Sequence, residues 1–223
     1  MRRASLAPGT LFPFMNDMPA KNEDLHGSVP ESCPVALLIV DVINDMEFEG
    51  GDKLLEQALP MAQQLSAFAA RAREAGVPVV YVNDNFGRWR SDFRALLDHC
   101  VTEERRGAPV ARLLTPEKSD YVVLKPKHSA FFSTTLDTLL EYLHARTLII
   151  TGLTTDLCVL FTASDAHMRD FHLVVPSDCC AAQDPERHAT AIELLRRNFQ
   201  ADTRPSTEVN FGELAERTGG LDA

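Results

Sequence analysis

The stretch Val35–Asp41, VALLIVD, holds six consecutive apolar residues and ends in a carboxylate. Further short, apolar runs rich in β-branched residues lie at positions 77–82, 121–124, 147–151 and 171–175. Runs of this length without polar alternation are typical of strands that are buried on both faces of a parallel sheet. The sequence therefore predicts a central, mostly parallel β-sheet.

Helical patterns separate these predicted strands. Apolar residues repeat at helical spacing at positions 65–72, 136–143, 159–166 and 191–199. The alternation of strand and helix predicts an α/β fold, with a doubly wound sheet and helices on both faces. Residues 201–204 indicate a sixth strand more weakly, which makes the expected sheet six-stranded.

The chain has room for one such domain. We predict an N-terminal arm or extension over residues 1–33, a folded domain over residues 34–212 and a C-terminal tail over residues 213–223. Prolines break every short apolar stretch of the arm. There is no signal-peptide pattern and no run long enough to span a bilayer, so we expect a cytoplasmic protein.

Charge and cysteine content narrow the possible functions. With a net charge of −10 and a pI of about 5.1, the chain should be repelled by nucleic acids and by anionic membranes, so neither is an expected partner. The five cysteines follow no disulfide framework and form no C-x-x-C pair. Free thiols suit a reducing compartment, and the spacing argues against a zinc ribbon.

Three reactive side chains are expected at the carboxyl edge of the sheet, where open α/β folds bind their ligands. Asp41 and Lys125 directly follow apolar runs, and Cys158 lies in the first turn of a helix that should begin near Thr155. Desolvation should raise the pKa of Asp41 toward that of a useful base, and Lys125 could balance the charges of a carboxylate and a thiolate. Taken singly, each has a structural alternative: a loop or N-cap acid, a surface lysine and a buried cysteine.

The expected position of Cys158 bears on its reactivity. Unpaired N–H groups and the dipole at a helix N-terminus favour a thiolate, and thiols in this setting can have a much lowered pKa. A Cys158 with a low pKa should react with iodoacetamide well below about pH 8.5, whereas an inert buried thiol should not. The same N–H groups could stabilise an oxyanion after the sulfur attacks a carbonyl carbon.

Three ordered segments resemble the isochorismatase-like cysteine hydrolases: Ala36–Asp45, Val123–Phe131 and Thr151–Val159. The resemblance extends over nearly the whole predicted domain, to about residue 205. It implies the isochorismatase-like hydrolase fold, in which the six strands take the order 3-2-1-4-5-6.

Carried onto this chain, the resemblance makes Asp41 the base, Lys125 its charge partner and Cys158 the nucleophile. It also implies a cis peptide bond before Thr154, with the N–H groups of Thr154 and Cys158 forming the oxyanion hole. Lys127 is the neighbouring candidate for the cation, but Lys125 is the first residue after the apolar run and matches the motif.

The resemblance implies a hydrolase, an amidohydrolase, that cleaves a C–N bond other than a peptide bond. Its substrate would be a small amide, carbamoyl or ureido molecule, and the reaction would pass through a covalent thioester. Family members commonly assemble, so we expect a homodimer or homotetramer. Two alternatives stay open: an isochorismatase-type hydrolase that acts on an enol ether, and a non-catalytic relative that binds a small ligand or a partner protein.

The loop after the second predicted strand departs from metal-binding relatives. Nicotinamidases also resemble this chain, but they carry an Asp-x-His element at this position, whereas residues 83–89 contain no histidine. We therefore expect no metal and no cofactor, and we place His188 on an exposed helix face.

Substrate contacts are expected from the same edge of the sheet. Asn85, Phe86 and Trp89 follow the second predicted strand, and Phe131 could add an apolar wall. Such residues suit a small planar or anionic substrate. A packed loop or a subunit interface explains the first three residues equally well.

Overall fold

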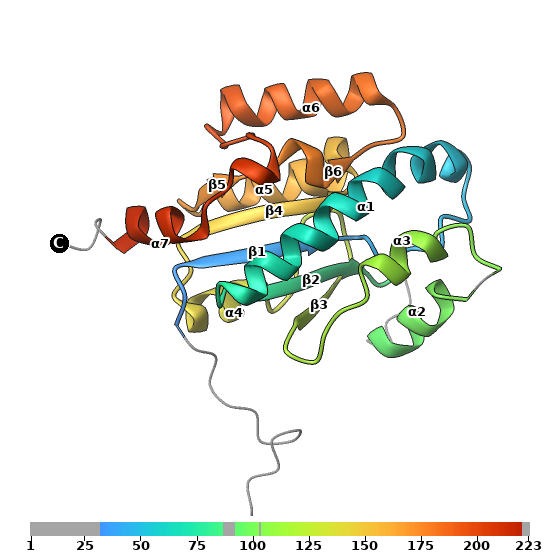
Figure 1. Cartoon of the computed structure of the whole chain (residues 1–223), viewed down its shortest axis with the longest axis horizontal. Helices are drawn as coiled ribbons and strands as arrows, with labels where there is room; N and C mark the ends of the chain where they lie inside the picture. Colours follow the sequence, from blue (N-terminus) through green and yellow to red (C-terminus); the bar gives the residue numbers. More distant parts are fainter. Residues whose placement is uncertain (1–31, 87–91, 103, 220–223) are drawn as a thin grey trace, which may run out of the picture. The chain divides into compact units, whose positions relative to one another are not determined.

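The computed structural model describes residues 32–86, 92–102 and 104–219. The predicted arm of residues 1–33 lies almost entirely outside this part of the chain. The strands are β1 (Val35–Val40), β2 (Val79–Asp84), β3 (Tyr121–Lys125), β4 (Thr147–Leu153), β5 (His172–Val174) and β6 (Cys180–Ala181). The sheet order is β3-β2-β1-β4-β5, and every neighbouring pair is parallel (Figure 1). This confirms the predicted α/β fold and the order of its first five strands.

The sixth strand differs in detail from the prediction. β6 is two residues long and pairs with the end of β4. The segment 201–204 adds one isolated parallel bridge, between Val174 and Asp202. At this point the Asp202 carboxylate accepts hydrogen bonds from the backbone N–H and the Nε–H of Arg204, at 3.2 and 2.9 Å. β5 itself offers only three residues for pairing.

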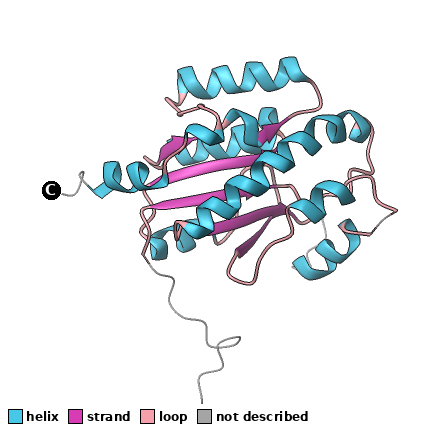
Figure 2. Ribbon diagram, viewed as in Figure 1, coloured by secondary structure: helices cyan, strands magenta, loops and turns pink. Residues whose placement is uncertain are grey.

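Helices cover both faces of the sheet (Figure 2). They are α1 (Gly51–Glu74), α2 (Phe93–Cys100), α3 (Ala108–Leu113), α4 (Leu136–Leu143), α5 (Leu160–His167), α6 (Pro185–Asn198) and α7 (Phe211–Gly219), with short helical turns η1 (Thr155–Val159), η2 (Ser177–Cys179) and η3 (Ser206–Glu208). α1, α3 and α7 share one hydrophobic core with the sheet, and α4, α5 and α6 share the other. Within the described ranges, no helix is both long and apolar enough to cross a membrane.

The two cores divide the residues of β1 between them. One core contains Val35, Leu37 and Ile39, and the other contains Ala36, Leu38 and Val40. All six are fully buried, which explains why this stretch shows no polar alternation. Burial of each large aliphatic side chain contributes about 1.5–3 kcal/mol, so β1 anchors the sheet and fixes the place of the residue that follows it.

The helix α7 includes residue 213, where the C-terminal tail was predicted to begin. Its first residue, Phe211, stacks on Phe68 of α1 with ring centroids 5.1 Å apart. Leu214 and Ala215 pack against the same core. The folded body therefore extends beyond residue 212.

Gly152, near the end of β4, lies where no side chain fits. Its φ is +108°, and an added Cβ would lie 2.1 Å from the carbonyl oxygen of Val40. Because backbone would have to move, we expect Gly152→Ala to lower the free energy of unfolding by about 4 kcal/mol or more. Gly76→Ala is the matched control: its φ is +73°, but no atom lies within 4 Å of the added Cβ, so its loss should stay near about 1 kcal/mol. Urea unfolding measures both, and equal losses would contradict the close approach of β1 and β4.

Candidate active site

Asp41 is the residue directly after β1, and its carboxylate is held by two donors at the edge of the sheet. Oδ1 accepts the backbone N–H of Asp84 at 2.7 Å, and Oδ2 lies 2.7 Å from Nζ of Lys125. The residue is only 7% exposed. Burial raises the pKa of Asp41, and the charge of Lys125 and the hydrogen bonds to Cys158, Lys125 and Asp84 offset only part of this rise. Asp41 is thus a buried carboxylate with an increased affinity for a proton.

Lys125 ends β3 and is fully buried. Its Nζ contacts Asp41 Oδ2, donates to the carbonyl oxygen of Lys127 at 3.1 Å and lies 4.0 Å from Oδ2 of Asp84. Burial opposes the charged form, but the charges of Asp41 and Cys158 and the hydrogen bond to Asp41 outweigh it and raise the pKa of Lys125. The structure therefore brings Lys125 to Asp41, while Lys127 is exposed and contributes its backbone.

Cys158 lies in η1, a single π-helical turn between β4 and α5. The carbonyl oxygen of Thr154 closes this turn by accepting the N–H groups of Leu157 and Val159 at 3.1 and 3.2 Å. The peptide bond between Leu153 and Thr154 is cis, at the position that the resemblance implies. The Sγ atom of Cys158 accepts a hydrogen bond from Nζ of Lys125 at 3.6 Å. The carboxylate, the ammonium and the thiol thus meet at one point, as the convergence of strand ends predicts.

The surroundings of Cys158 do not favour a low pKa. Burial raises the pKa of this thiol, the negative charge of Asp41 raises it further, and the charge of Lys125 compensates only in part. The residue is 8% exposed, so the cost of desolvating a thiolate exceeds what the helical turn and the lysine supply. A raised pKa favours the neutral thiol at rest, so the proton of the sulfur would move to a base when the sulfur reacts.

Alkylation of Cys158 should show this raised pKa. We expect the rate of reaction with iodoacetamide, followed by peptide mass spectrometry, to keep rising between about pH 7 and pH 10. The reason is that the thiolate fraction of a buried thiol beside a carboxylate grows over that whole interval. A rate that reaches its plateau below about pH 8.5 would instead support the thiolate that a helix N-terminus favours.

His128 is a neighbour of the sulfur that the sequence did not single out as a site residue. Its Nδ1 lies 3.8 Å from Sγ of Cys158, and its ring packs at a tilt against Phe161, with ring centroids 5.7 Å apart. His128 is exposed, so it lies beside the thiol at the surface. The available signal was its position three residues after Lys125, within the loop that the lysine motif defines.

Hydrogen bonds from α5 fix the loop that carries His128. Thr162 accepts the backbone N–H of Ala130 at 3.0 Å, and the hydroxyl of Ser129 donates to Oδ2 of Asp165. α5 directly follows the turn that holds Cys158. The lysine segment and the nucleophile turn are therefore positioned against the same helix.

The predicted substrate-binding residues divide into three cases. Asn85 and Phe86 lie at the same edge as Asp41; the backbone N–H of Asn85 donates to the carbonyl oxygen of Lys125 at 3.0 Å, and Phe86 is 46% exposed. Trp89 lies outside the described residues.

Phe131 is only 4% exposed and packs in the core that contains α4 and α5. Its ring faces Phe171 and lies 4.5 Å from the guanidinium of Arg169, so its expected role as a pocket wall stays a prediction.

Two further predictions concern histidines and metals. His188 does not lie on an exposed face of α6: it is half-buried, and its Nδ1 is 2.8 Å from Oγ1 of Thr155. Burial lowers the pKa of His188, against the opposing charge of Asp156. Across residues 32–86, 92–102 and 104–219, no three side chains of His, Cys, Asp or Glu cluster as metal ligands would. The expectation of a metal-free enzyme stays a prediction.

Residues 35–205 match the family model described as the isochorismatase domain. The chain is 36% identical over 174 residues to an uncharacterized isochorismatase family protein of Bacillus subtilis, a match that covers 78% of this chain and 95% of the relative. It is 30% identical over 179 residues to a probable inactive nicotinamidase of Arabidopsis thaliana, covering 75% and 90%. It is 29% identical over 178 residues to the ureidoacrylate amidohydrolase of Cronobacter sakazakii, covering 67% and 75%.

Solved structures show the same fold. The crystal structure of N-carbamoylsarcosine amidase from Thermoplasma acidophilum is similar to this chain with a TM-score of 0.61 and 27% sequence identity. The match covers 79% of this chain and 98% of the amidase.

Proposed function

The chain belongs to the isochorismatase family of hydrolases, and from this premise we propose that it is a cysteine hydrolase that cleaves the C–N bond of a small amide, carbamoyl or ureido molecule. One observation carries the proposal: Nζ of Lys125 lies 2.7 Å from Oδ2 of Asp41 and 3.6 Å from Sγ of Cys158. A base, a cation and a thiol in mutual contact are the parts that nucleophilic catalysis at sulfur requires. The similarity to an amidohydrolase and to an amidase supports an amide-like substrate.

In the first step the sulfur of Cys158 attacks the carbonyl carbon of the substrate while the thiol proton moves to the carboxylate of Asp41. The raised pKa of Asp41 suits it to accept this proton. Lys125 remains an ammonium throughout and balances the charge that passes between the carboxylate and the sulfur. Backbone N–H groups of Thr154 and Cys158 serve as donors to the oxyanion of the tetrahedral intermediate.

In the second step the C–N bond breaks and the departing nitrogen takes the proton from Asp41. This leaves a thioester on Cys158 and an ionised Asp41. A water molecule then gives a proton to Asp41 as its oxygen attacks the thioester carbon. The C–S bond breaks, the proton returns to the sulfur, and the acid departs. The net reaction converts an amide and water into an acid and an amine, and it returns Cys158 and Asp41 to their starting states.

Substrate contacts come from the residues that border the sulfur. His128 lies beside the thiol at the surface, where it can donate a hydrogen bond to the substrate's carbonyl or departing group. Asn85 and Phe86 follow β2 at the same edge, and Phe86 offers an exposed aromatic face. A polar ring, an amide and an aromatic at this edge of the sheet would suit a small polar, planar molecule.

The proposal is tested by incubating the protein with a panel of small carboxamides, carbamoyl compounds and ureido acids. Release of ammonia or amine is measured together with the intact mass of the protein after an acid quench. We expect release from part of the panel and an acyl or carbamoyl adduct that maps to Cys158. Hydrolysis of a vinyl ether assayed beside this panel, without any adduct, would favour the enol-ether alternative. Absence of both turnover and adduct over the panel would favour the non-catalytic alternative, which the similarity to a probable inactive relative makes worth testing.

A further inference from the structure

The turn that carries the nucleophile is held from outside the active site by the first turns of α6. Nδ1 of His188 lies 2.8 Å from Oγ1 of Thr155, and Nη2 of Arg187 lies 2.5 Å from Oδ2 of Asp156. Thr155 and Asp156 are the first two residues of η1, and Cys158 follows two positions later. Two adjacent residues of one helix therefore bind two adjacent residues of the nucleophile turn.

The two contacts differ in strength. Arg187 is 62% exposed, and an ion pair to such a side chain contributes about 1 kcal/mol or less. Thr155 is fully buried, so its hydroxyl needs a partner, and leaving it without one costs about 1–3 kcal/mol. The hydrogen bond to His188 is also directional, since it joins one ring nitrogen to one hydroxyl. It is therefore the contact that can fix the orientation of the turn.

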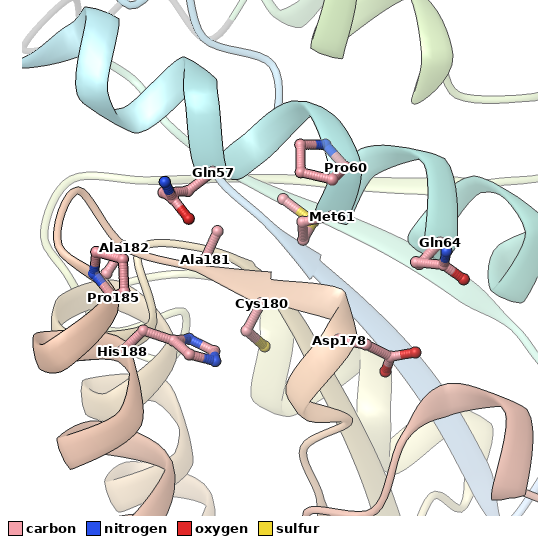
Figure 3. Close-up of a pocket in the computed structure, with 10 residues that line it drawn as sticks. All are labelled: Gln57, Pro60, Met61, Gln64, Asp178, Cys180, Ala181, Ala182, Pro185 and His188. Carbon is pink, nitrogen blue, oxygen red and sulfur yellow. The ribbon is translucent and has the colours of Figure 1, made fainter.

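Apart from the contact with Thr155, the described surroundings of His188 do not require an imidazole. On the same side of α6, Ala191 and Leu195 are buried apolar residues, so an aliphatic residue would continue the pattern. Beyond its bond to Thr155, His188 borders a cavity of about 280 Å³ between α1, β6 and the start of α6. Figure 3 shows the ring directed from α6 toward Cys180, across from Gln57 on α1. The cavity leaves room for side chains of other shapes, so substitutions at 188 can be accommodated without overpacking.

We propose that His188 is a positioning residue that acts through Thr155 to hold η1, and with it Cys158, in register with Lys125 and Asp41. The inference rests on the proposed function, because it assigns a role in presenting the nucleophile. Sγ of Cys158 lies 3.6 Å from Nζ of Lys125, and a displacement of a reacting group by about 1 Å costs up to about 100-fold in rate. Loss of the bond should therefore slow the reaction of the sulfur without changing the residues that touch it.

The test measures the rate of Cys158 alkylation by iodoacetamide at fixed pH, which requires no substrate, together with the melting temperature. Thr155→Val removes the hydroxyl at nearly constant shape, and His188→Leu removes the nitrogen. We expect both to slow alkylation about tenfold, within the effect of a sub-ångström to ångström displacement. The double variant should be no slower than either single variant, because both remove the same bond.

Conservative variants separate positioning from a purely structural role. Thr155→Ser keeps the hydroxyl, and His188→Asn keeps a hydrogen-bonding atom at the position of Nδ1; both should restore the rate to within about threefold of the wild type. His167→Leu is the control, since His167 lies on α5 and packs on Phe199 instead, and it should leave the rate unchanged. Unchanged or faster alkylation in Thr155→Val and His188→Leu, with only the melting temperature lowered, would overturn the proposal. Failure of the amide panel with this pattern intact would count against the proposed hydrolysis alone.

Discussion

Replacing Cys158 with alanine is expected to reduce the rate of substrate hydrolysis by about 10⁴-fold or more. The substitution removes the protein atom that bonds to the substrate carbon in the proposed reaction. Substrate binding and the backbone donors of the oxyanion hole would remain, so a small residual rate is compatible with the mechanism. The KM of any residual reaction should change little, because the sulfur contributes to the chemical step more than to binding.

The same substitution should leave the fold intact. Cys158 is 8% exposed and borders the core that contains α4 and α5, so loss of its sulfur costs about 1 kcal/mol. The pair between Lys125 and Asp41 at 2.7 Å does not involve the sulfur and should persist. Thermal unfolding and far-ultraviolet circular dichroism check this expectation.

Cys100→Ala is the matched control for this variant. Cys100 is fully buried in α2, and burial raises the pKa of its thiol to about 12. The two substitutions therefore remove the same group from comparable environments, and both should lower stability by a similar amount. Only Cys158→Ala should lose activity. If Cys158→Ala kept more than about a tenth of the wild-type rate, the thiol would not be the nucleophile, and the enol-ether reaction would become the better candidate.

The parts of the fold that could be predicted from sequence are those that depend on local pattern. Val35–Val40 is apolar throughout because both faces of β1 are covered, and this alone indicates a parallel sheet. The positions of Asp41 and Lys125 follow from the same logic, because residues after parallel strands gather at one edge. Their contact at 2.7 Å agrees with that shared edge.

The features that were missed depend on which elements pack together. The pKa of Cys158 is set by its burial and by the nearby carboxylate of Asp41, and neither can be read from a helix start. Phe131 lies in a core because Phe171 and Arg169 enclose its ring. His188 is a polar residue on the side of α6 that also carries Ala191 and Leu195, and only the docking of that helix on η1 shows that its ring reaches Thr155. Sequence periodicity identifies faces of elements, but it does not identify their partners.

Replacing Lys125 with methionine is the second change for which we expect a large effect, and here activity and stability should fall together. The ammonium is fully buried against Asp41 and 3.6 Å from Sγ of Cys158. Without it, the buried carboxylate should take up a proton near neutral pH and could no longer accept the proton of the thiol. We expect the hydrolysis rate to fall about 10³-fold, the size of effect usual for loss of acid–base function.

The loss of stability in Lys125→Met should depend on pH, with a defined sign. Removing one partner of a buried pair costs about 3–5 kcal/mol while the other stays charged. Burial already raises the pKa of Asp41 in the wild type, and loss of the cation should raise it further. The folded variant then binds a proton that the unfolded chain has lost above about pH 4. The stability of the variant should therefore fall as the pH rises from about 4 until Asp41 is ionised in the folded state, and its deficit relative to the wild type should open above the folded-state pKa of wild-type Asp41. Urea unfolding at about pH 5 and pH 8 measures this difference, and the deficit should be larger at pH 8.

Combining Lys125→Met with Asp41→Asn separates the electrostatic effect from the loss of a large side chain. The amide oxygen of the asparagine can still accept the N–H of Asp84, which donates to Oδ1 of Asp41 at 2.7 Å, while neither buried charge remains. Most of the stability lost at pH 8 should return, and the pH dependence should disappear, because replacing both partners of a buried pair is far less costly than removing one. Activity should not return, since the base is absent. A double variant as unstable as Lys125→Met would show that the lysine acts through packing, and the proposed role of its charge in sustaining Asp41 as the base would have to be abandoned.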